Sequence, residues 1–309
     1  MTAFTWVDGE RTIVYGEDAA AALQRLGWSR DADLLTTERA DPGIGPALLV
    51  GDGQVPALAE ALLPRIRHRR LVAWGGGRVI DVAKALASAG GGEVCAVPTT
   101  LSGAEMTSLH RKLPGREQGP SLRPVLVVAD PALMCSMPEP ALRASAMNAL
   151  AHGAEALYGP RRNPVASLAG ARGAQLVAAG DRALGSLLCA YAVDSAGYAL
   201  HHVLCQTIVR IAATPHADTN AAMLPLTMAA MLPRAPQAMA DLGAALGVGP
   251  EAIPTRIVEL SGGASVDIDR DLHERIAEAA LARAELRFTP APEVTREELL
   301  GLLVAATSR

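Results

Sequence analysis

The chain has 309 residues, which suits one large domain or two domains that share an interface. Half of the residues are hydrophobic and 19% are charged, so intrinsic disorder and low-complexity scaffolding are excluded. Lys and Arg number 28 against 32 Asp and Glu, which gives a net charge of −4. The basic excess that is typical of nucleic-acid-binding proteins is therefore missing.

No stretch reaches the roughly 18 to 20 uninterrupted apolar residues of a membrane span, and acidic residues stand near the start, where a signal peptide carries basic ones. The four cysteines lie far apart and form no C-x-x-C pair, at Cys95, Cys135, Cys189 and Cys205. This spacing argues against a disulfide framework or a thiolate metal site and fits a reducing compartment. We therefore expect a cytoplasmic enzyme with neither a membrane nor a nucleic-acid partner.

Short apolar runs alternate with helical stretches over the first 130 residues. One strand is predicted to end with residues 34–37, and further strands are predicted at 47–50, 71–74, 94–97 and 125–128. Helices are predicted at 56–66 and 79–88. Continuous apolar strands that alternate with helices indicate a parallel sheet covered by helices on both faces.

The pattern changes to helical periodicity from about residue 140 onwards. Ala-rich helices are predicted at 141–158, 164–179, 183–211 and 220–231, and shorter ones at 237–246, 253–262, 272–284 and 296–306. The change predicts an α/β domain over residues 1–133 and an all-α domain over residues 134–309. The loop 114–124, which contains Gly and Pro, is expected to be the most mobile surface segment.

Three glycines, Gly75, Gly76 and Gly77, follow the predicted strand 71–74 and open the next helix. Glycines at such a turn let the backbone approach a ligand, and the helix N-terminus presents unpaired N–H groups to a phosphate. A plain strand–helix turn would explain the glycines alone equally well. A second strand, however, ends in hydroxyl-bearing residues, at Thr99, Thr100 and Ser102. Two such loops at the carboxyl edge of a parallel sheet favour nucleotide binding.

Five of the seven histidines fall in the helical half. Apart from the isolated His273, they are His152, His201, His202 and His216. Asn148 and His152 are four residues apart and share a helix face, as do His202 and Gln206. A lone histidine on an apolar face is usually a hydrogen-bonded core residue, but three at turn-related positions favour a functional cluster. His201 points about 100° away from His202, so at most one of the two faces a given site.

Six stretches together resemble the superfamily of iron-containing alcohol dehydrogenases and dehydroquinate synthases, and within it the maleylacetate reductases. They are WGGGRVIDVAKALA, VPTTLSGAEMT, VADPALMCSMP, SAMNALAHGAEALYGPRRNPVASL, ALHHVLCQ and TPHADTNAAMLP. The resemblance runs from about Thr12 to the C-terminus. It implies a dehydroquinate synthase-like fold, in which a Rossmann-like domain is followed by an all-helical domain and the active site lies in the cleft between them.

The resemblance also implies a cofactor, NAD or NADP. Gly75, Gly76 and Gly77 would line its pyrophosphate, with Arg78 and Asp81 close behind. Thr99, Thr100 and Ser102 would contact the rest of the cofactor, and Thr37 would lie near the adenosine. Glu38 would repel the 2′-phosphate of NADP, whereas Arg39 and Arg78 would attract it, so the choice between NAD and NADP stays open.

In metal-dependent members of the superfamily, the metal is bound by an aspartate and a histidine of a D-A-x-x-H helix and by further histidines. Those further positions match His202 and His216. The helix here reads N-A-L-A-H, from Asn148 to His152, and a neutral amide replaces the only anionic ligand. Because a divalent cation then loses its main charge partner, we expect no catalytic metal.

We therefore expect an NAD(P)-dependent oxidoreductase in which imidazoles replace the metal at the substrate oxygens. Its catalytic residues would be His202, His216 and His152, with Asn148 and Gln206 beside them. The substrate would be a small molecule such as maleylacetate, with Arg111 or Arg161 pairing its carboxylates, or a natural product or modified peptide. A homodimer is plausible from the Ala-rich helical surface.

The chain also departs from the family pattern, with Gln206 where a second histidine is common, Arg78 and Ala104 where serines are common, and fewer residues than usual. A non-catalytic scaffold that has kept the fold is the alternative that these changes suggest. A lyase or cyclase of the dehydroquinate synthase kind would need the intact metal site, so Asn148 argues against it.

Overall fold

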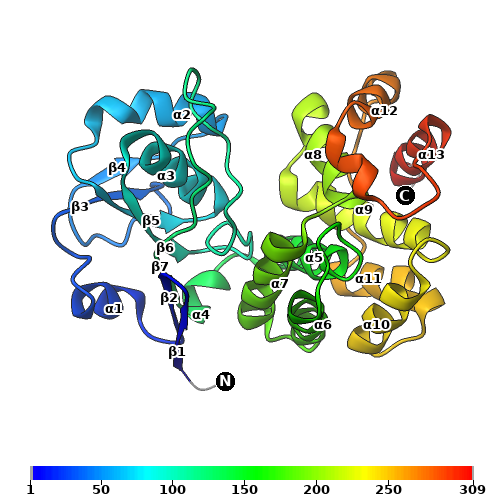
Figure 1. Cartoon of the computed structure of the whole chain (residues 1–309), viewed down its shortest axis with the longest axis horizontal. Coiled ribbons are helices and arrows are strands. Elements are labelled where there is room, and N and C mark those ends of the chain that lie inside the picture. The colour runs from blue at the N-terminus through cyan, green and yellow to red at the C-terminus, as the bar shows by residue number, and fades with distance from the viewer. Residues whose placement is uncertain (1–2, 308–309) are drawn as a thin grey trace. The chain divides into compact units, whose positions relative to one another are not determined.

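The computed structural model describes residues 3–307 and divides the chain into two compact units, Met1–Met137 and Pro138–Arg309 (Figure 1). The first unit is an α/β domain and the second is built from helices. The boundary expected after residue 133 lies close to the observed division.

One sheet of seven strands forms the centre of the N-terminal unit, in the order β1-β2-β7-β6-β5-β3-β4. The strands are β1 (Phe4–Asp8), β2 (Arg11–Tyr15), β3 (Ala32–Thr36), β4 (Ala47–Leu49), β5 (Arg70–Gly75), β6 (Glu93–Pro98) and β7 (Leu126–Ala129). All neighbouring strands pair in parallel except β1 and β2, which form an antiparallel hairpin. The five predicted strands are confirmed, whereas the hairpin extends the sheet beyond the parallel part that the sequence predicted.

Side chains that alternate along the buried strands feed two separate cores, one on each face of the sheet. On β5, Leu71 and Ala73 pack in the core beneath α2 (Val55–Leu62) and α3 (Gly77–Gly90). Val72 and Trp74 point to the other face and pack in the core beneath α1 (Ala19–Arg25). The short helices η1 (Leu63–Arg65) and α4 (Pro131–Met134) complete the unit. Because both faces are covered, the carboxyl edge of the sheet is where loops can form a site.

The C-terminal unit contains nine α-helices and three short 3₁₀ helices within the described part of the chain. The α-helices are α5 (Glu139–Ala156), α6 (Pro164–Ala178), α7 (Arg182–Ala196), α8 (Leu200–Ala212), α9 (His216–Met231), α10 (Pro236–Leu246), α11 (Ile253–Ser261), α12 (His273–Leu281) and α13 (Arg296–Thr307). The 3₁₀ helices are η2 (Pro250–Ala252), η3 (Arg270–Leu272) and η4 (Ala284–Phe288).

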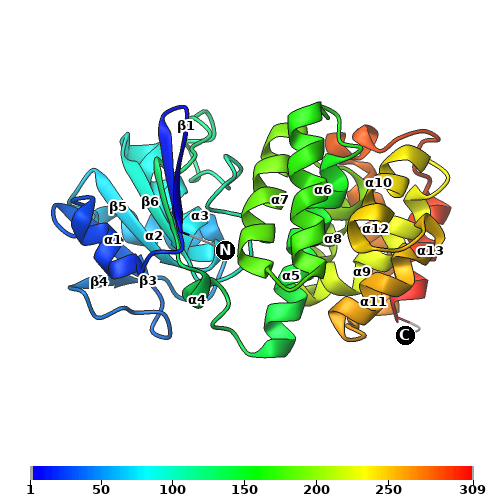
Figure 2. The same ribbon diagram turned by 90° about the horizontal axis from the view of Figure 1, so that it is seen from below.

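Small residues bring α5, α6 and α7 close together, and these helices lie side by side in Figure 2. A Cβ on Gly153 would lie 2.9 Å from the carbonyl oxygen of Gly170, and one on Gly173 would lie 2.8 Å from that of Gly185. Such distances are too short for a real side chain, so only glycine fits at these crossings. The Ala- and Gly-rich composition of this half of the chain therefore serves close helix packing.

The long helix predicted over 183–211 is wrong, because the chain breaks into α7 and α8, which meet at an angle of 101°. Gly197 ends α7 with a φ of +81°, and a Cβ there would lie 3.0 Å from Cγ of Pro160. Helix α9 likewise begins at His216, one turn before the predicted start. Within the described residues no single helix has the length and apolar character to cross a membrane, and α7 with α8 meets that test only as a bent pair.

Candidate active site

The glycine turn of the N-terminal unit joins β5 to α3 and lies against the loop that follows β6. An ideal Cβ on Gly76 would lie 2.9 Å from Cγ2 of Thr100, and one on Gly77 would lie 3.0 Å from Cβ of Ser102. The backbone N–H of Thr99 donates to the carbonyl of Gly75 at 3.1 Å. The structure therefore brings the two predicted loops together, and the glycines are what allows them to approach.

This edge of the sheet has the features that a nucleotide phosphate requires. Helix α3 has 14 residues and begins at Gly77, so the N–H groups of its first turn lie beside two residues without side chains. The hydroxyl oxygen of Thr100 is buried and has no hydrogen-bond partner among the described residues. A backbone turn free of Cβ atoms, next to an unpartnered buried hydroxyl, fits a dinucleotide pyrophosphate.

Lys84, on α3, fastens the loop after β6 to this helix. Its buried ammonium group donates to the carbonyl oxygens of Ala104 at 2.9 Å, Thr107 at 3.2 Å and Leu109 at 2.8 Å. It also forms an ion pair with Asp81 at 2.9 Å. Asp81, which was expected close behind the cofactor, is therefore engaged with Lys84, a residue that the sequence reasoning did not single out.

Glu105 lies on the same loop and is completely buried. Neither of its carboxyl oxygens has a hydrogen-bond partner among the described residues. Burial raises the pKa of Glu105 to about 7, although the positive charges of Lys84 and Arg11 oppose the shift. The side chain is therefore close to half protonated at neutral pH.

Two other residues expected at the cofactor take different positions. Arg78 donates to the Asp52 carboxylate at 2.5 Å and to the carbonyl of Gly51 at 3.2 Å, so its charge is matched within the loop after β4. Thr37 lies directly after β3 and is half-buried, and no described contact joins it to the glycine turn.

His152 and His202 meet in the interior of the C-terminal unit. His152 lies on α5 and His202 on α8, and their rings stack with centroids 4.6 Å apart and planes 8° apart. Burial lowers the pKa of both imidazoles, that of His202 to about 3, and the neighbouring charge of His216 adds to the effect. Both rings are therefore neutral at physiological pH.

Glu155 is the residue of this site that the sequence reasoning missed. It is completely buried on α5, and its Oε1 accepts the backbone N–H groups of Ala199 and His201, each at 3.0 Å. Its Oε2 lies 2.5 Å from Nδ1 of His202. The carboxylate thus caps the start of α8 and holds the His202 ring. Glu155 follows His152 by three residues, so helical spacing alone could have placed it on the same face.

His201 has a structural role, as the 100° separation from His202 indicated. Its Nε2 lies 3.0 Å from Oδ1 of Asn220, and its Nδ1 lies 2.9 Å from the hydroxyl oxygen of Thr227. The ring is fully buried, and burial lowers its pKa to about 3. Both ring nitrogens are occupied by the core, so His201 has no donor or acceptor left for a ligand.

Gln206 faces an ion-pair network rather than an imidazole. Nη1 of Arg283 donates to its Oε1 at 2.8 Å, and Nη2 donates to the hydroxyl of Tyr198 at 3.1 Å and to Glu285 at 3.1 Å. The positive charge of Arg283 contributes to the lowered pKa of His202. Arg283 is therefore an arginine whose charge acts on the histidine cluster.

The two arginines expected to pair with substrate carboxylates lie in different units. Arg161 donates to the carbonyl oxygens of Ser195 and Asp194, at 3.2 and 3.4 Å. Arg111 lies in the loop between β6 and β7 of the other unit.

Asn148 and His216 complete the set of predicted catalytic residues. Asn148 is 3% exposed and lies one turn before His152 on α5. His216 is exposed at the first position of α9, where Nδ2 of Asn220 lies 3.3 Å from its Nε2. Across residues 3–307, no three His, Cys, Asp or Glu side chains are grouped so that they could hold a metal ion. At the positions that the resemblance assigns to a metal, the chain carries imidazoles and one neutral amide.

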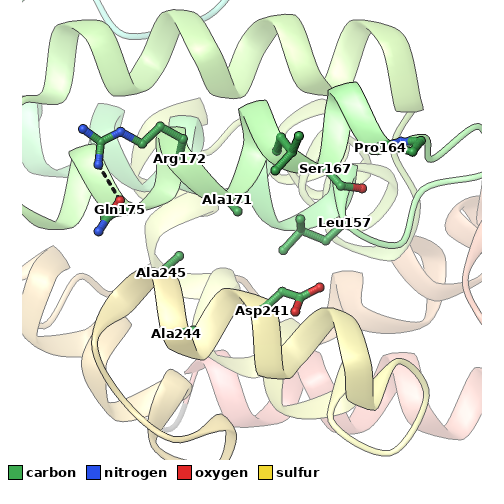
Figure 3. Close-up of a pocket in the computed structure, with 10 residues that line it drawn as sticks. Leu157, Pro164, Ser167, Ala171, Arg172, Gln175, Asp241, Ala244 and Ala245 are labelled. Atoms are coloured by element: carbon green, nitrogen blue, oxygen red, sulfur yellow. Dashed lines mark hydrogen bonds between the residues drawn. The ribbon is translucent and has the colours of Figure 1, made fainter.

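A groove on the C-terminal unit is separate from these residues. It lies between α6 and α10 and has a volume of about 710 Å³ (Figure 3). Ala171 and Arg172 line it from α6, Asp241 and Ala244 line it from α10, and Leu157 also contributes to its lining. None of the candidate catalytic or cofactor-binding residues lines it.

The chain combines a glycine turn in an α/β unit with a histidine cluster in a helical unit. This is the combination that the resemblance to a family of oxidoreductases implies. The C-terminal profile of the Fe-containing alcohol dehydrogenase family matches residues 143–307. The chain belongs to this family of oxidoreductases. The resemblance seen in the sequence is confirmed.

Relatives and solved structures place the chain more narrowly. The maleylacetate reductase of Pseudomonas aeruginosa is 33% identical over an alignment 333 positions long, which covers 94% of each chain. Maleylacetate reductase 1 of Rhodococcus opacus is 33% identical over 274 residues, covering 82% of this chain and 77% of the relative. The crystal structure of maleylacetate reductase from Agrobacterium tumefaciens has a TM-score of 0.84 and 26% identity, with 100% of this chain and 99% of that chain covered.

Proposed function

We propose that the protein is an NAD(P)-dependent reductase that works without a bound metal on maleylacetate or a closely similar unsaturated oxo acid. Asn148 is the observation that carries this proposal. It places a neutral amide one turn before His152, at the position of the anionic metal ligand, in a chain that is one-third identical to a maleylacetate reductase.

The N-terminal unit would hold the cofactor at the turn Gly75–Gly77 and at the hydroxyls of Thr100 and Ser102. The bound cofactor supplies the hydride. Hydride addition to a conjugated carbonyl compound leaves negative charge on the carbonyl oxygen. We assign the binding of that oxygen to His216, which is exposed, and to the unpartnered Nδ1 of His152. Stabilising such charge is usually the largest single contribution to this kind of catalysis.

A fluorescence titration tests the cofactor, and a turnover assay tests the reaction. We expect saturable binding of NADH or NADPH, followed by oxidation of the reduced cofactor when maleylacetate is added, at a rate that EDTA does not change. A scaffold would bind neither nucleotide. A dehydrogenase for a different substrate would bind the nucleotide and leave maleylacetate unreduced, which would overturn the substrate assignment.

A further inference from the structure

We infer that Glu155 is a positioning residue that fixes the proton of His202 on Nδ1 and so makes Nε2 the nitrogen that faces the substrate. The inference rests on the proposed function and adds a residue that acts through His202. Its basis is the two oxygen atoms of one buried carboxylate, the three nitrogen atoms that they contact, and the buried Nε2 of His202, which has no partner among the described residues.

The two oxygens of Glu155 have different partners. Oε1 accepts two backbone N–H groups, from Ala199 and His201, each at 3.0 Å. These donors can only donate, so an oxygen atom must stand at that position. Oε2 is then left for Nδ1 of His202, at 2.5 Å. Burial raises the pKa of Glu155, and the backbone N–H groups of Ala199 and His201 oppose that shift. In its ionised form the carboxylate can only accept, and Nδ1 of His202 then carries the ring proton.

The other ring nitrogen of His202 has no partner. Nε2 is buried and forms no hydrogen bond with any described residue. In a neutral ring whose proton is on Nδ1, Nε2 holds a lone pair and can accept a hydrogen bond from a substrate hydroxyl. The stacked ring of His152 and the tilted ring of Tyr198, 5.9 Å away, limit the directions in which His202 can turn.

This arrangement suits proton transfer coupled to hydride transfer. In the reverse of the proposed reduction, an enol O–H proton passes to Nε2 of His202 while the bound cofactor would take up a C–H hydride, leaving the conjugated carbonyl compound. The imidazolium that forms lies against the carboxylate of Glu155, which compensates its charge. Reduction runs the same steps in reverse, so that Nε2 returns its proton to the substrate oxygen.

Glu155→Gln tests the inference with little change of shape. The two backbone N–H groups require the amide oxygen at the Oε1 position, so the amide NH₂ must face Nδ1 of His202. An NH₂ group donates, so the ring proton moves to Nε2 and the nitrogen facing the substrate loses its lone pair. All the hydrogen bonds of the side chain are kept. We therefore expect a folded protein whose kcat falls roughly 100-fold or more, the scale of a general acid–base contribution.

The tautomer itself can be read by ¹⁵N NMR of the histidine rings in the full chain, with the His202 signals assigned by their loss in His202→Asn. We expect the proton on Nδ1 in the wild type and on Nε2 in Glu155→Gln. Glu139→Gln is the matched control, because Glu139 lies on the same helix but is exposed and paired with Arg182 and Arg143. It should change neither the tautomer nor the turnover.

A proton on Nε2 in the wild type, or a ring that Glu155→Gln leaves unchanged, would overturn the inference. So would a loss of turnover by Glu155→Gln that is equally large in a His202→Asn background, because Glu155 would then act through some other group. The NMR measurement needs neither cofactor nor substrate. A wild type that binds no NAD(P)H would therefore refute the proposed function, while the tautomer would still decide the role of Glu155.

Discussion

His202 and Glu155 share a contact of 2.5 Å between Nδ1 and Oε2, inside a unit where His202 also stacks on His152. In metal sites the second ring nitrogen of a histidine ligand is commonly held by a carboxylate in this way. Here the carboxylate is present, but Asn148 stands where the anionic ligand would be. In the metal-free enzyme that we propose, the cluster would keep the support of a metal site without the charge that retains a metal.

This combination predicts that the purified protein carries far less than one equivalent of iron or zinc, and that chelation leaves its activity intact. Asn148→Asp should create measurable affinity for Zn²⁺, because it restores a carboxylate one turn from His152. Elemental analysis and isothermal titration provide the measurements. Asn163→Asp is the control, since Asn163 caps α6 and aspartate caps equally well. Stoichiometric metal in the wild type, lost together with activity on chelation, would refute the prediction.

Replacing His216 should separate catalysis from folding. His216 is exposed, whereas His202 is buried against Glu155, so His216→Asn should leave the melting temperature unchanged and His202→Asn should lower it. We expect His216→Asn to cost roughly 2 to 4 kcal/mol of transition-state stabilisation, about a thirty- to a thousand-fold loss of rate. Steady-state kinetics with maleylacetate measures this, and His68→Asn in the other unit is the control. Normal turnover by His216→Asn would remove this residue from the site.

Gly76→Ala should weaken NAD(P)H binding at least about ten-fold, the effect of roughly 1.4 kcal/mol. The added Cβ would lie 2.9 Å from Cγ2 of Thr100, so two causes are possible: a displaced loop or a blocked approach to the pyrophosphate. Thr100→Ser removes that methyl group and keeps the hydroxyl. We expect Gly76→Ala/Thr100→Ser to bind as weakly as Gly76→Ala, as measured by nicotinamide fluorescence.

Gly90→Ala is the matched glycine control, because it lies on the same helix with nothing within 4 Å of its added Cβ. It should bind the cofactor normally. Recovery of affinity in the double variant would show that Gly76 serves only the packing of the loop.

Glu105 should make the stability of the protein depend on pH. Its pKa is about 7 in the folded state and 4.5 ordinarily. Between these values the folded protein keeps a proton that the unfolded chain has lost, so stability falls as the pH rises through this window. The loss is about 1.4 kcal/mol per pH unit and roughly 3 kcal/mol in all. Urea unfolding at pH 5 and pH 8 measures it.

Glu105→Gln has the shape of the protonated acid and cannot ionise, so it should remove most of this difference between pH 5 and pH 8. Glu60→Gln, on the exposed side of α2, should leave the difference as it is in the wild type. An equally large difference in Glu105→Gln would show that another group carries the pH dependence.

Periodicity predicted the buried elements well, because a strand such as β5 is apolar along its whole length and bounded by polar or glycine residues. It did not predict the β1–β2 hairpin, whose first strand alternates between half-buried and exposed residues at the edge of the sheet. Periodicity also predicted a single helix in place of α7 and α8, because the apolar pattern continues across Gly197. That break depends on the Glu155 carboxylate, distant in sequence, which receives the first N–H groups of α8.

The candidate site, like the fold, could be predicted from the sequence only in part. The positions of Gly76, Thr100 and His202 follow from local spacing or from the family resemblance. The interactions that hold the segments around them do not, because Lys84 binds Ala104, 20 residues away, and Arg283 binds Gln206, 77 residues away. Glu155 lay within reach of a helical-spacing argument, but its importance depends on contacts with a different helix.

Lys84 has a consequence for how the loop after β6 can evolve. Its ammonium group contacts that loop through the carbonyl oxygens of Ala104, Thr107 and Leu109. Every amino acid supplies the same carbonyl, so the lysine constrains the path of the main chain and sets no requirement of its own on the side chains at those three positions. A serine in place of Ala104 would therefore keep the hydrogen bond from Lys84 to the carbonyl oxygen at this position. The lysine itself cannot be replaced in this way, because all three carbonyls depend on one nitrogen atom.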